Sequence, residues 1–409
     1  MAPRKPNLGP PSTGTEATRL IRAGQAPEPL AKTVGPPIQK GSTVLLPNAA
    51  SLYDDANYLT YGRQGLAAQT ALQDALAGLE NAAGVTLYPS GVAALAGALL
   101  AVLNAGDEIL VTDAAYKPTR RFCDHALKRF GVKTTYFDPC VAPEVLVGEA
   151  SPATRLILME SPGSLSFEVQ DMARVAELAK PRHILTVADN TWGAGYLYKP
   201  LDHGIDIALQ ALTKYVGGHS DLFMGSAATA DPKLLRALHD GVLHLGWAVS
   251  GEDAYQMLRG LRTMPTRLAR HGASGLEVAA WLRDQPMVSE VRHPALPGAP
   301  GHDLWRRDYI GASGLFGFIL QPGPQAAVDA FLDELDLFGL GFSWGGFESL
   351  AISSGDQLTH RRFPSGHGPA SRSATRASWG PFARSEPEPA TPPVRAPSTV
   401  SVAISAQFK

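Results

Sequence analysis

Short apolar runs alternate with helix-forming segments between residues 84 and 230, and this alternation restricts the fold more than any other feature. Runs such as Gly84–Tyr88, Asp107–Thr112 and Ile205–Leu212 are largely apolar, as in strands buried on both faces of a sheet. Segments such as Thr70–Leu79 and Val169–Lys180 instead space their apolar residues three and four apart, which indicates helices. This order predicts an α/β fold with a doubly wound, mostly parallel sheet.

One lysine, Lys214, lies where the apolar run Ile205–Leu212 gives way to a glycine-rich turn. An ammonium group near the end of a buried strand needs a partner or a chemical role. Desolvation favours the neutral amine, which attacks aldehydes, so Lys214 is a candidate for a covalent imine link to pyridoxal phosphate. The alternative is a lysine whose stem is buried and whose ammonium reaches water.

A second apolar run, His183–Asp189, ends in a carboxylate. Side chains at the carboxyl ends of parallel strands face the crevice in which α/β sheets bind ligands. Beside the pyridine nitrogen of pyridoxal phosphate, Asp189 would keep that nitrogen protonated and make the ring an electron sink. Alternatively, Asp189 only caps the turn that follows it.

The turn Ser90-Gly91-Val92 joins a predicted strand to an Ala/Leu-rich helix. Free backbone N–H groups at a helix N-terminus attract anions, so this turn is a candidate phosphate site, although many similar turns bind nothing. His219 and Asp221 could suggest a metal site. No further ligand lies at a useful spacing, so local hydrogen bonding of the turn is the favoured interpretation and no metal is expected.

The composition of the chain is that of a globular enzyme. Its 409 residues predict two domains and an arm, and the hydrophobic content of 44% with a net charge of −2 gives no electrostatic reason to bind nucleic acid or membranes. Cys123 and Cys140 form no metal-binding or CxxC spacing, which predicts a reduced, cytoplasmic protein. The N-terminus has no apolar core of a secretory signal, and no run reaches the ~20 apolar residues of a membrane span.

Three motifs, Asp189-Asn-Thr-Trp192, Thr213–Asp221 and Ser343–Leu350, together resemble the Cys/Met-metabolism family of pyridoxal-phosphate (PLP) enzymes, and within it the bacterial cystathionine β-lyases. The resemblance implies PLP fold type I, as in aspartate aminotransferase, with a large sheet domain and a smaller C-terminal α/β domain. The segments expected from it are an N-terminal arm (1–65, with 1–15 disordered), a PLP-binding domain (66–262), a smaller domain (263–380) and a disordered, aberrant tail (381–409).

The resemblance also assigns roles to residues. The implied cofactor-binding residues are Tyr61, Arg63, Ser90, Gly91, Val92, Tyr116, Ser164, Asp189, Thr213 and Lys214. Tyr61 and Arg63 would reach the cofactor phosphate of a neighbouring subunit, within a homotetramer built from dimers that share active sites. Tyr116 would stack on the pyridine ring and assist Lys214 in catalysis. Ser343, Trp344 and Arg376 would bind the substrate, with Arg376 holding its carboxylate.

The end of the chain departs from the family pattern. Arg376 follows Trp344 at about the family spacing, but the Ser/Arg/Pro-rich flanks from about Ile352 onward predict disorder rather than the strand and helix of relatives. Two explanations stay open. Arg376 is still the carboxylate ligand, or the reading frame slipped near residue 352 and the match is chance.

The reaction implied by the resemblance is cleavage of L-cystathionine to homocysteine, pyruvate and ammonia, a step of methionine biosynthesis. Trp344, where γ-lyases tend to have a smaller residue, and Ser164 both favour β-elimination over γ-elimination. The alternatives within the family are a cystathionine γ-lyase or an O-acylhomoserine sulfhydrylase. An alternative of another class is a PLP-binding protein whose catalysis is impaired by the aberrant tail. A nicotinamide dehydrogenase is disfavoured, because no GxGxxG opens a helix.

Overall fold

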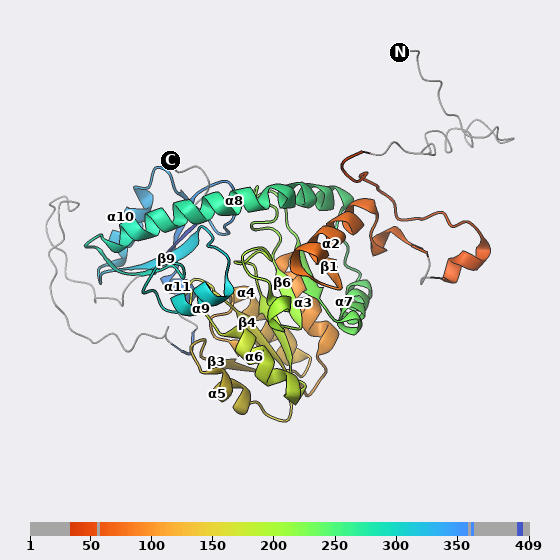
Figure 1. Cartoon of the computed structure of the whole chain (residues 1–409), viewed down its shortest axis with the longest axis horizontal. Coiled ribbons are helices and arrows are strands. Elements are labelled where there is room, and N and C mark those ends of the chain that lie inside the picture. The colour runs from red at the N-terminus through yellow and green to blue at the C-terminus, as the bar shows by residue number, and fades with distance from the viewer. Residues whose placement is uncertain (1–32, 55–57, 359–360, 364–398, 404–409) are drawn as a thin grey trace, which may run out of the picture. The chain divides into compact units, whose positions relative to one another are not determined.

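Residues 38–409 contain two β-sheets in the computed structural model (Figure 1). The structure describes residues 33–54, 58–358, 361–363 and 399–403. The chain divides into two units, residues 1–37 and 38–409, and all that follows concerns the second. The predicted disordered segment 1–15 lies outside the described residues.

The larger sheet lies between residues 84 and 229. Its strands are β1 (Gly84–Tyr88), β2 (Glu108–Thr112), β3 (Lys133–Phe137), β4 (Thr154–Glu160), β5 (Leu185–Asp189), β6 (Ile207–Gln210) and β7 (Gly225–Thr229). They are ordered β1-β7-β6-β5-β4-β2-β3. Pairs from β3 to β6 are parallel, whereas β7 is antiparallel to both β6 and β1. The prediction of a mostly parallel sheet is confirmed.

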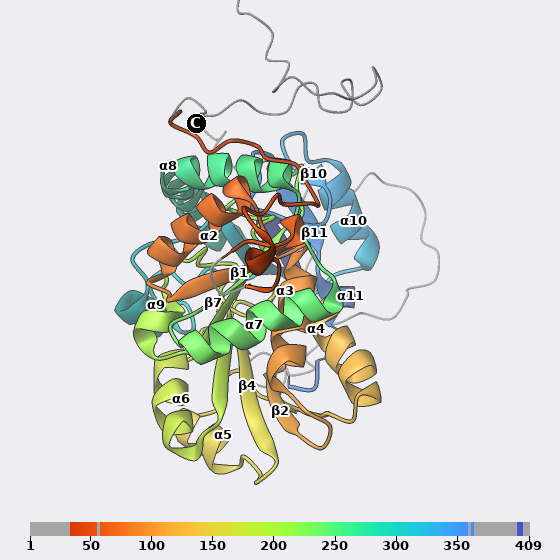
Figure 2. The same ribbon diagram turned by 90° about the vertical axis from the view of Figure 1, so that its right-hand side faces the viewer.

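Helices cover both faces of this sheet. They are α2 (Ala67–Glu80), α3 (Gly91–Val102), α4 (Lys117–Arg121), α5 (Pro143–Gly148), α6 (Met172–Ala179), α7 (Pro232–Leu245) and α8 (Gly251–Arg283). Residues of α2, α5, α6 and α8 share one apolar cluster, and residues of α3 and α7 share another. In Figure 2, α7 crosses in front of β1 and β7. The sheet is therefore doubly wound, as predicted, but α5 lies in a stretch that the sequence analysis leaves without structure.

The strands supply both clusters because successive side chains point to opposite faces. In β2, Leu110 joins the cluster of α2 and α6, while Ile109 and Val111 join that of α3 and α7. In β5, Ala188 joins the cluster of α2 and α6, and Val187 joins that of α3 and α7. Burial on both faces explains why these strands read as continuous apolar runs.

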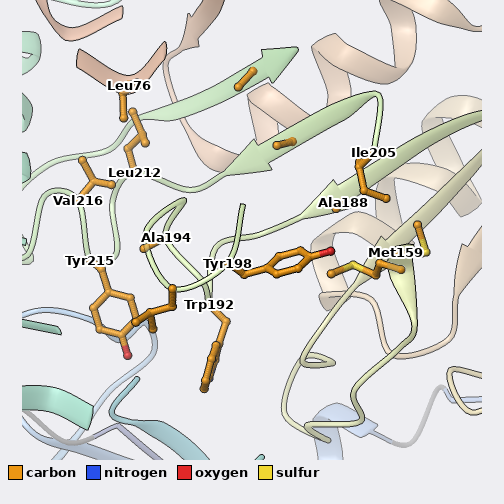
Figure 3. Close-up of a cluster of buried hydrophobic side chains, with 14 of the residues drawn as sticks. Leu76, Met159, Ala188, Trp192, Ala194, Tyr198, Ile205, Leu212, Tyr215 and Val216 are labelled. Carbon is orange, nitrogen blue, oxygen red and sulfur yellow. The ribbon is translucent and has the colours of Figure 1, made fainter. Parts of the chain in front are cut away.

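Aromatic side chains fix the segments that follow β5 and β6 (Figure 3). Trp192 donates its indole N–H to the Leu315 carbonyl at 3.0 Å, and Tyr215 accepts the backbone N–H of Gly314 at 3.2 Å. The Tyr198 and Tyr309 rings stack with centroids 4.8 Å apart. The bonds of Trp192 and Tyr215 hold the segments after β5 and β6 against the start of strand β9, which begins at Leu315.

The second sheet has the order β10-β11-β12-β9-β8 and its own apolar cluster. Its elements are β8 (Val288–Arg292), α9 (His302–Asp308), β9 (Leu315–Leu320), α10 (Gln325–Asp333), β10 (Gly339–Leu340), β11 (Leu350–Ser353), α11 (Gly355–Leu358) and β12 (Thr399–Ala403). β12 pairs antiparallel with both β9 and β11. The prediction of disorder over 381–409 is therefore wrong for residues 399–403.

A single helix, α8, connects the two sheets. It continues through Pro265 to Arg283, and the predicted boundary between domains, after residue 262, falls inside it. Met257 and Leu268 pack in the cluster of the first sheet, whereas Ala279 and Leu282 pack in that of the second. Among the described helices, none is long and apolar enough to cross a membrane.

Candidate active site

A cavity of about 680 Å³ opens at the carboxyl ends of β4, β5 and β6. This is the edge at which parallel sheets place ligands. Most residues predicted from the sequence meet there: Ser90, Gly91, Val92, Tyr116, Ser164, Asp189, Thr213, Lys214, Ser343 and Trp344 all line the cavity. The predicted site is therefore one place in the fold, and its volume suits a small organic ligand.

Lys214 lies in the turn after β6 and points into this cavity. Its Nζ donates a hydrogen bond to the Ser343 hydroxyl at 2.7 Å and lies 5.5 Å from the centroid of the Trp344 ring. Burial lowers the pKa of Lys214 to about 8, and the negative charge of Asp189 acts in the opposite direction. At pH 7 about a tenth of Lys214 is therefore the neutral, nucleophilic amine, far more than of a lysine in water.

Asp189 ends β5, where it both caps a turn and lines the cavity. Its Oδ1 accepts hydrogen bonds from the backbone N–H and the hydroxyl of Thr191, at 3.0 and 2.6 Å, so it does cap the following turn. It also lines the cavity. Burial raises the pKa of Asp189, while the Thr191 hydrogen bonds and the charge of Lys214 lower it. Thr191, which the sequence analysis missed, also accepts the Ala211 N–H at 2.9 Å and so ties Asp189 to the turn that carries Lys214.

The N-terminus of α3 closes another side of the cavity. The Ser90 hydroxyl caps this helix by accepting the Ala93 N–H at 3.1 Å. A Cβ at position 91 would lie 2.5 Å from the Ala211 Cβ, so only glycine allows α3 to approach the turn that carries Lys214. The Thr213 hydroxyl exchanges hydrogen bonds with the Met224 backbone, at 3.1 and 3.3 Å. Helix amides near Gly91 are thus held close to the lysine, as a phosphate cradle requires.

The loop of Ser343 and Trp344 packs on the backbone beneath Lys214. Ser343 and Gly345 both have positive φ, of 94° and 86°. A Cβ at Gly345 would lie 3.0 Å from the Tyr215 nitrogen and 3.1 Å from the Lys214 carbonyl carbon, so a side chain there would push the loop away. The Trp344 and Tyr215 rings are 5.2 Å apart. This contact positions Trp344 as part of the cavity wall.

Tyr116 lies between β2 and α4, over the same cavity. Its backbone N–H donates to the Glu160 carboxylate Oε2 at 2.7 Å. Burial raises the pKa of Tyr116, and the charges of Glu160 and Asp189 add to this effect. Glu160, the last residue of β4, is a second residue that the sequence analysis missed. Its place at the end of an apolar run was the only signal in the sequence.

A buried ion-pair cluster, made of Asp113, Arg120, Glu168 and Arg361, reaches the cavity through Asp113 and Arg361. Arg361 lines the cavity, and its Nη1 donates to Glu168 Oε1 at 2.8 Å. The predicted carboxylate ligand Arg376 lies outside the described residues. Neither Arg361 nor its acidic partners were singled out in the sequence analysis, because their pairing depends on chain segments far apart in sequence.

Tyr61 and Arg63 do not line the cavity. Arg63 instead donates to the Leu243 carbonyl at 2.9 Å, and its guanidinium lies 5.9 Å from the centroid of the Tyr61 ring. Their predicted contact with a cofactor therefore requires a second subunit. His219 hydrogen-bonds the Gly217 carbonyl at 2.7 Å, within its own turn. In the described part of the chain, no three His, Cys, Asp or Glu side chains gather closely enough to hold a metal ion.

These residues fit pyridoxal phosphate. Lys214 supplies an amine with a depressed pKa, Asp189 supplies a carboxylate at the end of the neighbouring parallel strand, and Gly91 lets the N-terminus of α3 approach closely. Tyr116 offers an aromatic ring on the same cavity wall. The aldehyde of the cofactor would react with Lys214, its ring nitrogen would face Asp189, and its phosphate would bind the amides near Gly91.

Comparison with known proteins gives the same result. The Cys/Met metabolism PLP-dependent enzyme family matches residues 17–370. A putative cystathionine beta-lyase of Rhizobium johnstonii is 44% identical over 339 residues, covering 82% of this chain and 85% of that protein. The cystathionine beta-lyase of Escherichia coli strain K12 is 39% identical over 346 residues, covering 82% and 87%.

Solved structures agree in fold. The cystathionine gamma synthase of Xanthomonas oryzae pv. oryzae, in complex with aminoacrylate and cysteine, superposes with a TM-score of 0.77 at 30% identity, over 92% of this chain and 89% of that one. The family match covers most of the chain, and the cavity contains the lysine and aspartate that such an enzyme needs. The chain belongs to the Cys/Met metabolism family of PLP-dependent enzymes.

Proposed function

We propose that this enzyme is a carbon–sulfur β-lyase that cleaves L-cystathionine to homocysteine, pyruvate and ammonia. The observation that carries the proposal is the Lys214 amine, hydrogen-bonded to the Ser343 hydroxyl in a cavity that Asp189 and Tyr116 also line. Several relatives at 37–44% identity over most of the chain carry the name cystathionine beta-lyase. Trp344 in the cavity wall also favours β-elimination over γ-elimination, as the sequence analysis expects.

When bound, the cofactor supplies an electron sink for the negative charge that forms at the substrate Cα. Asp189, held by Thr191, would face the ring nitrogen of the bound cofactor and favour its protonated form. Lys214 removes the Cα proton as a general base, since its lowered pKa makes the neutral amine more available near pH 7 than in an ordinary lysine. Ser343 accepts a hydrogen bond from Nζ and so orients the amine, and Trp344 limits the space beside it.

Product analysis of the purified protein tests this function. With L-cystathionine we expect pyruvate, ammonia and homocysteine in equal amounts. Formation of 2-oxobutyrate would indicate a γ-lyase, and sulfide-dependent use of an O-acylhomoserine would indicate a sulfhydrylase. Cofactor bound through Lys214 without turnover of any of these substrates would support the impaired PLP-binding protein.

The pKa of Lys214 predicts how the protein takes up its cofactor. Only the neutral amine attacks an aldehyde, and the pKa is lowered to about 8. In cofactor-free protein, the rate of covalent attachment should rise about tenfold per pH unit below pH 8 and level off above it. Because the Asp189 charge raises this pKa, Asp189→Asn should move the curve to lower pH. A stopped-flow pH series measures this, and a rate that still rises steeply above pH 9 would contradict the assignment.

We propose further that a homotetramer, built from dimers in the cytoplasm, completes the site with Tyr61 and Arg63 of a partner subunit. Arg63→Ala and Lys214→Ala would then each be inactive alone. When the two variants are mixed, unfolded and refolded, hybrid dimers contain one intact site, and about a quarter of wild-type activity should return. No recovery, with dimers verified by light scattering, would mean that Arg63 acts within its own chain or not at all.

The mouth of the cavity predicts a preference among substrates. Lys117 and Arg121, four residues apart on α4, both line the cavity, are exposed and have no ion-pair partner in the described residues. They favour a sulfur substituent that ends in a carboxylate, as cystathionine does. The charge-reversed double variant Lys117→Glu/Arg121→Glu should raise KM for S-carboxymethyl-L-cysteine about fivefold. The neutral S-carbamoylmethyl-L-cysteine is the matched control, and an equal change for both substrates would contradict the role.

A further inference from the structure

Glu160 is an acidic side chain of the cavity that the reaction above does not use. It ends β4, and its neighbour across the strand pair is Asp189 at the end of β5. Paired residues on adjacent strands point to the same face of a sheet, so the two carboxyl groups lie side by side. Two carboxylates in a poorly solvated place do not both remain charged. A second acid beside Asp189 therefore needs a function of its own.

The partner of Glu160 is the backbone of Tyr116. Oε2 accepts the Tyr116 N–H at 2.7 Å, across 44 residues of sequence. The backbone of Glu160 is itself fixed, because the Gln170 amide donates to the Glu160 carbonyl at 2.7 Å. Ser161 Oγ accepts the Gln170 N–H at 3.0 Å and completes this support. Glu160 thus connects a rigid strand end to the segment from which the Tyr116 ring projects.

We propose that Glu160 is a positioning residue for Tyr116. Its Oε2 fixes the backbone amide of Tyr116, and this fixes the place of the phenol ring above Asp189 and Lys214. The role of the ring rests on the proposed function, but the contact between Glu160 and Tyr116 does not. Without this bond the segment between β2 and α4 loses its contact at Tyr116 with the end of β4 and keeps the bond from the Ser164 N–H to the Ala114 carbonyl, at 2.8 Å, to the chain after β4. The ring then samples positions away from the reacting atoms.

The surroundings of Glu160 determine which substitution can replace it. Burial raises the pKa of Glu160 well above its ordinary value, and the charge of Asp189 raises it further, against the Tyr116 hydrogen bond. The charged and titratable groups that face it are Asp189 on β5, Tyr116 before α4 and, beyond Asp189, Lys214. Burial and the charge of Asp189 thus both favour the neutral form of Glu160. A glutamine at this position would imitate the neutral acid and still offer a carbonyl oxygen to the Tyr116 N–H.

The test compares Glu160→Gln with Glu160→Leu. We expect Glu160→Gln to keep kcat within about threefold, and Glu160→Leu to lower kcat about 30-fold with little change in cofactor affinity, because a misplaced group costs up to ~10²-fold. In a Tyr116→Phe background, where the phenol is already absent, Glu160→Leu should cost less than about threefold. Glu80 is the matched control, since it is buried, has its pKa raised to about 7 and does not line the cavity. Glu80→Leu should lower stability without this dependence on Tyr116.

A second measurement does not need catalysis. Nitration of Tyr116 by tetranitromethane, followed by peptide mass spectrometry, should be several-fold faster in Glu160→Leu than in wild type and unchanged in Glu160→Gln. Equal losses in Glu160→Gln and Glu160→Leu, or an unchanged cost of Glu160→Leu in the Tyr116→Phe background, would overturn the proposal. If wild type releases no pyruvate from any cysteine S-conjugate, the proposed function fails, and the nitration rates still decide whether Glu160 positions Tyr116.

Discussion

Lys214→Ala is expected to lower kcat for pyruvate release by at least about 10³-fold while leaving the fold intact. In the proposed function the amine is the general base and the attachment point of the cofactor, and no other lysine except Lys117 lines the cavity among the described residues. Lys117 is exposed at the mouth. Loss of the Nζ bond to Ser343 removes only one partly exposed contact, so the thermal unfolding temperature should change little.

The covalent link itself can be followed. Borohydride reduction and mass spectrometry of wild type should find the cofactor adduct on the peptide that contains Lys214, and the alanine variant should have none. Lys214→Arg is the matched control, because it keeps a positive charge but cannot form the link. An adduct of normal yield in Lys214→Ala, or more than about a tenth of wild-type activity, would refute the assignment.

Asp189→Ala has the second largest expected effect, a fall in kcat of about 10²-fold or more, with weaker cofactor binding. In the proposed function, removing the carboxylate would leave the ring nitrogen of the cofactor without its partner and weaken the electron sink. It also removes the acceptor of two Thr191 hydrogen bonds and loosens the turn that carries Lys214. Steady-state kinetics and cofactor titration measure the two effects separately.

Thr191→Val separates the chemical role of Asp189 from its structural one. This variant loses the hydroxyl that bonds Asp189 Oδ1 and the Ala211 N–H, but keeps the carboxylate. We expect a loss of only about threefold to tenfold in kcat, the equivalent of one or two hydrogen bonds. If Thr191→Val were as damaging as Asp189→Ala, turn geometry rather than charge would be the contribution of Asp189.

Sequence reasoning finds Lys214 and Asp189 because each ends an apolar run, and the carboxyl ends of parallel strands share one edge of a sheet. It does not find Glu160, since one glutamate after an apolar run is most often a solvated residue. Only the register that pairs Glu160 with Asp189 reveals its place. Thr191 is missed for a similar reason, because a threonine in a turn is ordinary until the bonds to Asp189 and Ala211 are known.

The missed elements of the fold have physical causes as well. Helix α5 begins at Pro143, a residue that suits the first turn of a helix, but it is only six residues long and shows little periodicity. Strand β12 alternates Val400 and Val402 with polar residues, which is a strand pattern, yet the Ser/Arg/Pro-rich surroundings dominate a reading by composition. Its pairing with β9 and β11 joins segments about 50 to 80 residues apart, which no local pattern contains.

The passage of α8 through both apolar clusters has a thermodynamic consequence. At 33 residues it is about 50 Å long, and its two halves belong to different hydrophobic cores. Melting either core would leave half of a long helix without its packing, and a helix of that length gains little stability by itself in water. The two cores should therefore lose their structure in one cooperative heat-absorption peak, so that calorimetry records a single denaturation where the presence of two sheets would suggest two.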